Sequence, residues 1–181
     1  MPSVCVFCGS NTGRDERYIA AAQLLARTMA AADLTLVFGG GKIGLMGVIA
    51  DEMLRHDGKV IGVIPQFLYE REVGHDGVTQ LEIVQSMHER KKRMAELSNA
   101  FIAMPGGWGT LEEVAEILTW KQLGLIPQPV ALLNVDSFFD PLLAQFHRMS
   151  DDGFLAKANS DLLIVADDPV TLVDRLNLTG S

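Results

Sequence analysis

The chain has 181 residues, of which 48% are hydrophobic and 21% charged, and its formal net charge is −8. This length and composition are typical of one globular domain with a full hydrophobic core. The acidic balance disfavours a nucleic-acid partner, because a phosphate backbone is bound by a basic surface. The sequence shows no signal peptide and no apolar stretch of the ~20 residues that span a membrane, so we expect a cytoplasmic protein.

Short apolar runs alternate with amphipathic segments along the chain. Seven runs are predicted as strands: 3–8, 34–38, 59–64, 81–84, 100–104, 129–135 and 162–166. Six segments are predicted as helices: about 15–31, 45–56, 87–98, 110–124, 137–149 and 169–176. Residues 66–80 have no clear period and are predicted to form a long loop, of a length that is often functional.

The predicted strands are apolar on both faces, which is typical of a parallel sheet covered by helices on both sides. Right-handed crossovers then give a doubly wound, Rossmann-like α/β fold of about seven strands. We expect residues 1–181 to form a single nucleotide-binding domain.

Three glycine-rich turns follow predicted strands, after Cys8, Phe38 and Met104. Ligands of open parallel sheets bind beyond the carboxyl ends of the strands, and all three turns lie on that edge. We therefore predict one crevice where the turns converge. From the first two turns we expect substrate contacts by Ser10, Gly40, Gly41 and Met46.

The second turn, GGGKIGLMG at 39–47, contains the spacing G-x-G-x-x-G as Gly39, Gly41 and Gly44. This spacing is typical of dinucleotide sites when an acidic residue follows about twenty positions later. Here the turn follows the second strand, and no acid at that distance clearly ends a strand. The pattern favours a tight turn beside a nucleotide over a nicotinamide site, and we expect no cofactor.

Cys5 and Cys8 form a C-x-x-C inside and at the end of the first predicted strand. Redox pairs of this spacing begin a helix, and zinc sites need a second pair. Residues three apart on a strand point to opposite faces. We interpret both as buried cysteines. The four histidines show no metal-ligand spacing, so no metal is expected.

The third turn, PGGWGTLEE at 105–113, joins a predicted strand to a helix. Such a turn presents free backbone N–H groups at the positive end of the helix dipole, where phosphates bind. The alternative is that Thr110 and Glu113 form only a capping box. Three glycines in one turn are costly unless a ligand approaches closely. A carboxylate at Glu113 would repel a phosphate, but it could accept hydrogen bonds from the hydroxyls of a sugar or polarise a water. We therefore expect Glu113 to face the sugar of a nucleotide.

Basic residues begin the predicted helix at 87–98, within the segment MHERKK. Positive charge in a first turn opposes the helix dipole and indicates an anion nearby. Arg90 could form a two-pronged contact with a carboxylate or a phosphate. The alternative is an ordinary solvated face.

These motifs together resemble the cytokinin riboside 5′-monophosphate phosphoribohydrolase family, also called the "lonely guy" family. The resemblance rests on PGGWGTLEE and on the Arg90–Lys91 pair. It extends over nearly the whole chain through CVFCGSNTG, FGGGKIGLMG, MHERK and ILTWKQLG. Family members were often labelled lysine decarboxylases. No lysine here lies in a recognisable pyridoxal phosphate setting.

The resemblance implies hydrolysis of the N-glycosidic bond of N6-substituted adenosine 5′-monophosphates, in cytokinin biosynthesis, to a free base and ribose 5-phosphate. It implies that Arg90 and Glu113 are the catalytic pair. It further implies a homodimer with the site near the interface. The substrate-binding residues expected from the matching motifs are Glu72, Arg90, Lys91, Gly107, Trp108, Gly109, Thr110, Leu111, Glu112, Glu113 and Thr119. Trp108 takes a position often held by Tyr, so it should change fit rather than chemistry.

Breaking the ribose–adenine bond builds positive charge on the sugar and negative charge on the base. We expect Glu113 to steady the sugar and orient a water, while Arg90 positions the substrate and stabilises charge. The rival hypothesis is a nucleotide-binding or regulatory module without turnover, which the same glycine turns would serve.

Overall fold

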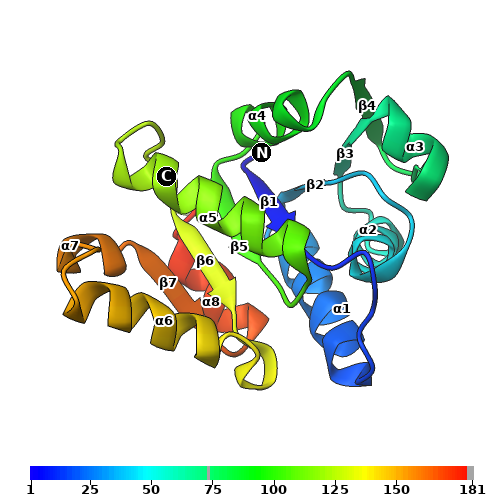
Figure 1. The fold of residues 1–181 in the computed structure, drawn as a ribbon. Coiled ribbons are helices and arrows are strands. Elements are labelled where there is room, and N and C mark those ends of the chain that lie inside the picture. The colour runs from blue at the N-terminus through cyan, green and yellow to red at the C-terminus, as the bar shows by residue number, and fades with distance from the viewer. Residues whose placement is uncertain (73, 179–181) are drawn as a thin grey trace.

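Seven parallel strands form one sheet in the computed structural model, which describes residues 1–72 and 74–178. Their order across the sheet is β4-β3-β2-β1-β5-β6-β7 (Figure 1). The strands are β1 (Ser3–Phe7), β2 (Thr35–Phe38), β3 (Val60–Pro65), β4 (Gln80–Val84), β5 (Ala100–Ala103), β6 (Val130–Leu133) and β7 (Leu163–Ala166). The prediction of a doubly wound parallel sheet is confirmed.

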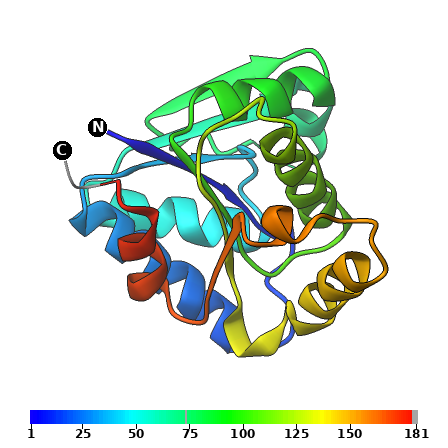
Figure 2. The ribbon, with the colours of Figure 1, turned by 90° about the vertical axis from the view of Figure 1, so that its left-hand side faces the viewer.

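Helices cover both faces of the sheet (Figure 2). On one face lie α1 (Glu16–Ala31), α2 (Gly44–Arg55) and α8 (Pro169–Leu176). On the other lie α4 (Met87–Glu96), α5 (Trp108–Gln122) and α6 (Asp140–Asp151). The shorter elements are α3 (Gln66–Glu72), the 3-10 turn η1 (Val135–Ser137) and α7 (Lys157–Ser160). None of the described helices is long and apolar enough to cross a bilayer.

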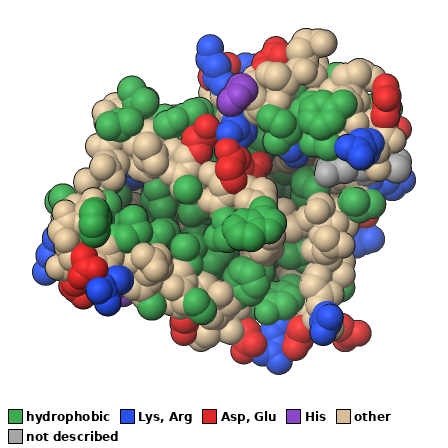
Figure 3. All heavy atoms as spheres, viewed as in Figure 1, with side chains coloured by type: hydrophobic (Ala, Val, Ile, Leu, Met, Phe, Trp, Pro, Cys, Tyr) green, Lys and Arg blue, Asp and Glu red, His purple; other side chains and the backbone are tan. Residues whose placement is uncertain are grey.

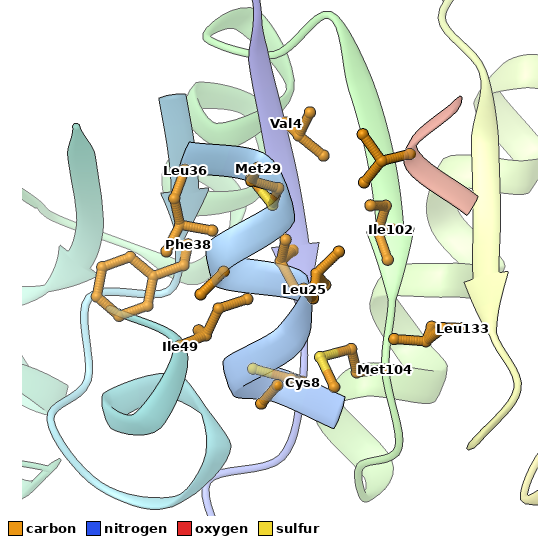
Figure 4. Close-up of a cluster of buried hydrophobic side chains, with 14 of the residues drawn as sticks. Val4, Cys8, Leu25, Met29, Leu36, Phe38, Ile49, Ile102, Met104 and Leu133 are labelled. Carbon is orange, nitrogen blue, oxygen red and sulfur yellow. The ribbon is translucent and has the colours of Figure 1, made fainter. Parts of the chain in front are cut away.

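Side chains of β1 pack into two separate hydrophobic cores, one on each face of the sheet, because successive side chains of a strand point to opposite sides. Val4 and Cys8 join the core under α1 and α2, where Leu25 and Phe38 are fully buried (Figure 4). Cys5 joins the core under α4 and α5. The two cysteines are buried and free, as their spacing on the strand predicts.

The chain reverses its direction of growth across the sheet between β1 and β5. It builds outward from β1 to β4, returns to place β5 beside β1, and then builds outward to β7. At this switch the loops after β1 and β5 meet, since the Gly9 N–H donates to the Pro105 carbonyl at 3.2 Å. The loop after β2 joins them, because the Leu45 N–H donates to the Gly9 carbonyl at 3.0 Å. All three predicted glycine turns therefore converge.

Two helices that the sequence did not predict are present. The segment predicted as a loop at 66–80 begins with α3, whose seven residues are too few to show a helical period. Helix α7 has only four residues. Between α3 and β4, Gly74 forms an antiparallel bridge with Gly41, so this segment lies against the glycine turn after β2.

The predicted start of α5 is wrong. The helix begins at Trp108 with Gly107 as the N-cap, so Thr110 is already inside its first turn and forms no capping box with Glu113. Thr110 is buried, with 3% of its surface exposed, because its hydroxyl packs against Gly106. A Cβ on Gly106 would lie 2.1 Å from the Thr110 Oγ1.

The backbone of Gly44 packs closely against the turn after β1. Its φ is +65°, and an added Cβ would lie 2.2 Å from the backbone carbon of Ser10. Gly124 has a similar φ of +71° with nothing within 4 Å of its Cβ position. We expect Gly124→Ala to lower the free energy of unfolding by about 1 kcal/mol, the cost of the left-handed backbone alone. Gly44→Ala should cost at least about 2 kcal/mol more, because the clash is with backbone. Equal urea midpoints for the two variants would contradict this packing.

Candidate active site

A cavity of about 150 Å³ opens at the carboxyl edge of the sheet, beside the end of β1. It is bounded by the turns after β1 and β2, by α4 and by the start of α5. Its described lining residues are Val6, Phe7, Cys8, Gly9, Ser10, Gly39, Met46, Arg90, Met94, Gly107, Trp108, Gly109, Thr110 and Glu113. The cavity lies where the topology of a doubly wound sheet predicts a ligand.

Glu113 is the carboxyl group of this cavity. It lies on the second turn of α5 and is half-buried. Burial raises the pKa of Glu113 from 4.5 to about 7; the Arg90 charge opposes the rise and the Glu112 charge adds to it. At neutral pH the carboxyl and carboxylate forms are therefore present in comparable amounts. A group in this range can both accept and return a proton during a reaction.

Arg90 supplies the positive charge of the cavity. Its side chain is buried, and two carbonyls hold its guanidinium in place. Nε donates to the Val63 carbonyl at 3.1 Å, and Nη2 donates to the Gly39 carbonyl at 2.8 Å. Nη1 makes only a long contact of 3.8 Å with the Met87 sulfur. The predicted two-pronged contact with an anion is therefore restricted, because the backbone already occupies the Nε side of the guanidinium.

The start of α5 forms the third part of the site. Gly107 offers no side-chain cap, so among the described residues the first N–H groups of the helix, those of Trp108, Gly109 and Thr110, have no partner within the helix. An added Cβ at Gly107 or Gly109 would meet nothing within 4 Å. Packing of the chain therefore does not require these two glycines. They leave the helix N-terminus open to an approaching anion.

Several predicted site residues lie outside the described lining of the cavity. They are Gly40, Gly41, Lys91, Leu111, Glu112 and Thr119. The Lys91 ammonium lies 2.5 Å from a Glu112 oxygen and 3.1 Å from a Glu116 oxygen, which ties α4 to α5. Figure 3 shows the basic and acidic side chains gathered where these helices meet. The Glu72 side chain lies outside the described residues. The roles of these seven residues stay predictions.

Carboxylates of the chain itself pair with part of the basic segment in α4. Ser86 caps the helix by accepting from the Glu89 N–H at 3.1 Å. Besides the carboxylates that hold Lys91, Glu82 holds Arg93, with its oxygen 2.6 Å from the Arg93 Nε. The basic side chains of Lys91, Lys92 and Arg93 are therefore paired with carboxylates, and Arg90 is the buried basic residue of the helix.

Some lining residues were missed by sequence reasoning. Cys8 is the last residue of the first predicted strand, and Gly39 is the first residue of the second glycine turn. Both positions border the predicted crevice, so the sequence could have identified them as lining residues. Met94 carried none, because a methionine on a helix usually belongs to a core. His75 lies outside the described lining but supports the turn after β2: it is buried, its backbone N–H donates to the Gly40 carbonyl at 2.9 Å, and its Nε2 lies 3.0 Å from an Asp51 oxygen.

The fold and the cavity define a class of protein: a Rossmann-like fold with a buried guanidinium and a carboxyl group beside an uncapped helix start. A family model described as a possible lysine decarboxylase matches residues 46–176. A protein of Oryza sativa subsp. japonica, named as the probable cytokinin riboside 5′-monophosphate phosphoribohydrolase LOGL9, is 47% identical over 173 residues, which cover 96% of this chain and 76% of the relative. The cytokinin riboside 5′-monophosphate phosphoribohydrolase LOG5 of Arabidopsis thaliana is 43% identical over the same shares.

The chain therefore belongs to the cytokinin riboside 5′-monophosphate phosphoribohydrolase family, as its motifs indicated. Solved structures show the same fold. A molybdenum cofactor carrier protein of Chlamydomonas reinhardtii superposes with a TM-score of 0.72 at 25% identity, over 97% of this chain and 98% of that one. A molybdenum cofactor binding protein of Rippkaea orientalis gives 0.72 at 22% identity, over 97% and 95%.

The raised pKa of Glu113 predicts a pH dependence of stability. The folded chain holds this proton more tightly than the unfolded chain, in which the carboxyl has its ordinary pKa of 4.5. Its contribution is therefore complete below about pH 4.5 and is lost as pH rises through about 7. Relative to Glu113→Gln, the native chain should lose about 2–3 kcal/mol of unfolding free energy between pH 4 and 8. Urea titrations of both proteins across this range test it, and parallel curves would contradict a buried, titrating Glu113.

Proposed function

We propose that this chain hydrolyses the N-glycosidic bond of N6-substituted adenosine 5′-monophosphates, with Arg90 and Glu113 as its catalytic pair. The products are the free base and ribose 5-phosphate. The observation that carries the proposal is the convergence of Glu113, the Arg90 guanidinium and the uncapped start of α5 on one cavity. The family to which the chain belongs supports the reaction class.

The start of α5 is the binding site for the 5′-phosphate in this proposal. Its N–H groups at Gly109 and Thr110 point along the helix dipole, which favours a bound anion. The ribose then lies deeper in the cavity, within reach of the carboxyl group one turn further along the helix. Ser10 and Met46 border the same space.

Charge stabilisation at both ends of the breaking bond lowers the barrier. As the bond between C1′ and the base nitrogen breaks, the ionised Glu113 faces the positive sugar and accepts a proton from the attacking water. The hydroxyl adds to C1′, and Glu113 then returns the proton to the departing base, so that the base leaves neutral and Glu113 is ionised again. Arg90 stabilises the negative charge of the departing base, and its two carbonyl contacts hold it ready for this role.

Further parts of the proposal follow from the family resemblance. They are a homodimer with the site near the interface, a place in cytokinin biosynthesis and a cytoplasmic location, which suits the free thiols of Cys5 and Cys8. The non-catalytic binding module is not favoured by the comparisons. A pyridoxal phosphate decarboxylase needs a lysine for its Schiff base, and the described cavity lining contains none.

Chromatography of the reaction products tests the chemistry. Incubation with AMP and with N6-isopentenyl-AMP should release free base from at least the substituted nucleotide. Glu113→Gln keeps the shape of the side chain and removes its charge, so we expect turnover to fall at least about 100-fold while AMP binding is retained. Unchanged turnover would remove Glu113 from the chemistry. Nucleotide binding without any released base would favour the regulatory module.

Gly109→Ala separates the phosphate site from the fold. The added methyl group has free space in the protein, and alanine favours a helix over glycine by about 1 kcal/mol. We therefore expect stability to be kept or raised, while the affinity for AMP falls at least about 10-fold because the methyl group crowds the phosphate. Calorimetry of binding and urea unfolding measure the two effects. Gly153→Ala, also with an open Cβ position but outside the described lining of the cavity, is the control for binding alone, because its φ of +81° makes the substitution cost stability. Full AMP affinity in Gly109→Ala would place the phosphate elsewhere.

A further inference from the structure

We propose that Trp108 is the platform on which the purine base of the substrate stacks, and that it sets the affinity for the base without taking part in the chemistry. The inference rests on the proposed function, because it assumes that the 5′-phosphate binds at the start of α5 and that the ribose faces Glu113. It gives a binding site to the base, which is the one part of the nucleotide that the proposed function leaves without a contact surface.

The first observation is that the cavity is small. Its volume of about 150 Å³ is below the roughly 300 Å³ at which pockets for complete small ligands begin. A phosphate and a ribose fill such a space. The base of a bound nucleotide must therefore extend from the ribose and the Arg90 side to the mouth of the cavity, where its faces would be exposed to water unless a side chain covers one of them.

The second observation is that an unpartnered aromatic side chain stands at this mouth. Trp108 lines the cavity, and 88% of its surface is exposed, the largest exposed fraction among the large hydrophobic side chains described. It is the first residue of α5, next to the N–H groups assigned to the phosphate. Apolar side chains are visible at the surface near this end of α5 (Figure 3). An indole covered by a purine gains both buried area and ring stacking.

A neighbouring hollow of about 280 Å³ is the alternative place for the base. Tyr18 and Phe138 wall it, and it shares Gly9, Ser10 and Gly107 with the cavity. The described lining of this hollow includes neither Glu113 nor Arg90. A ligand whose phosphate binds at Gly107–Thr110 and whose ribose faces Glu113 therefore extends away from the hollow. The base then lies on the side where Trp108 is the available aromatic surface.

The test compares ligands with and without a base. In Trp108→Ala we expect the Kd for AMP to rise about 10-fold, which is typical of losing one base–aromatic stack. The Kd for ribose 5-phosphate, which lacks the base, should stay within about 2-fold. Trp108→Tyr should recover most of the AMP affinity, since a phenol ring also stacks. These binding constants need no turnover, so they are informative even if the wild-type chain releases no base.

Fluorescence supplies a second readout, because the chain contains only two tryptophans. Trp120 lies further along α5, outside the described lining of the cavity, and is half-buried. Trp120→Phe should retain the fluorescence change caused by AMP, and Trp108→Phe should lose it. Ribose 5-phosphate should change the fluorescence of neither variant strongly.

Three results would overturn the proposal. Equal weakening of AMP and ribose 5-phosphate in Trp108→Ala would mean that Trp108 supports the phosphate site. Unchanged AMP affinity would mean that the base lies elsewhere, and a loss of affinity in Phe138→Ala would then place it in the neighbouring hollow. A change of oligomeric state by size-exclusion chromatography, with unaltered AMP affinity per site, would make Trp108 a contact between copies of the chain. Failure of the proposed function is distinct, since it appears as absent hydrolysis by the unmodified chain.

Discussion

The parallel pairing of β1 with β5 is the constraint on which the site depends. Val4 to Phe7 pair with Ala100 to Ala103, although almost one hundred residues separate them in the chain. This pairing brings the turn after Cys8 against the turn after Met104, and the Gly9–Pro105 hydrogen bond fixes the contact. Neither turn could form the cavity alone. The end of β1 and the start of α5 line the same cavity.

The proposed chemistry depends on two opposite charges at the wall of the cavity, the buried Arg90 guanidinium and the half-buried Glu113 carboxylate. Two backbone carbonyls stabilise the buried Arg90 guanidinium by accepting its hydrogen bonds. One belongs to Val63 in β3, and the other belongs to Gly39, directly after the neighbouring β2. Glu113 has no such donors among the contacts described, and burial therefore raises the pKa of its carboxyl group to about 7. In the proposed reaction, the same environment that destabilises the ionised glutamate would let it respond strongly to a positive sugar. The proposal therefore links stability and reactivity through this one residue.

The parallel sheet, the burial of its strands and the edge that carries the cavity follow from local patterns in the sequence, whereas the order of the strands comes from the structure alone. Apolar runs on both faces indicate a parallel sheet, and glycine turns after strands indicate where a ligand binds. The start of α5 was misplaced because Thr110 and Glu113 have capping-box spacing, whereas packing of Thr110 against Gly106 decides the outcome. Lys91 was predicted to contact the substrate, and that role stays a prediction; its pairing with carboxylates of another helix could not be predicted from local sequence. His75 and Asp51 are 24 residues apart, and only the tertiary fold brings them together.

A crystal structure of the Glu113→Gln variant with bound AMP would show directly where the nucleotide lies. We expect phosphate oxygens to accept hydrogen bonds from the backbone N–H groups of Gly109 and Thr110. We also expect the C1′ atom to lie beside the carboxamide at position 113, within reach of the Arg90 guanidinium on the side of the base. A nucleotide whose phosphate lies away from the start of α5, or whose C1′ atom lies far from position 113, would contradict the proposed function.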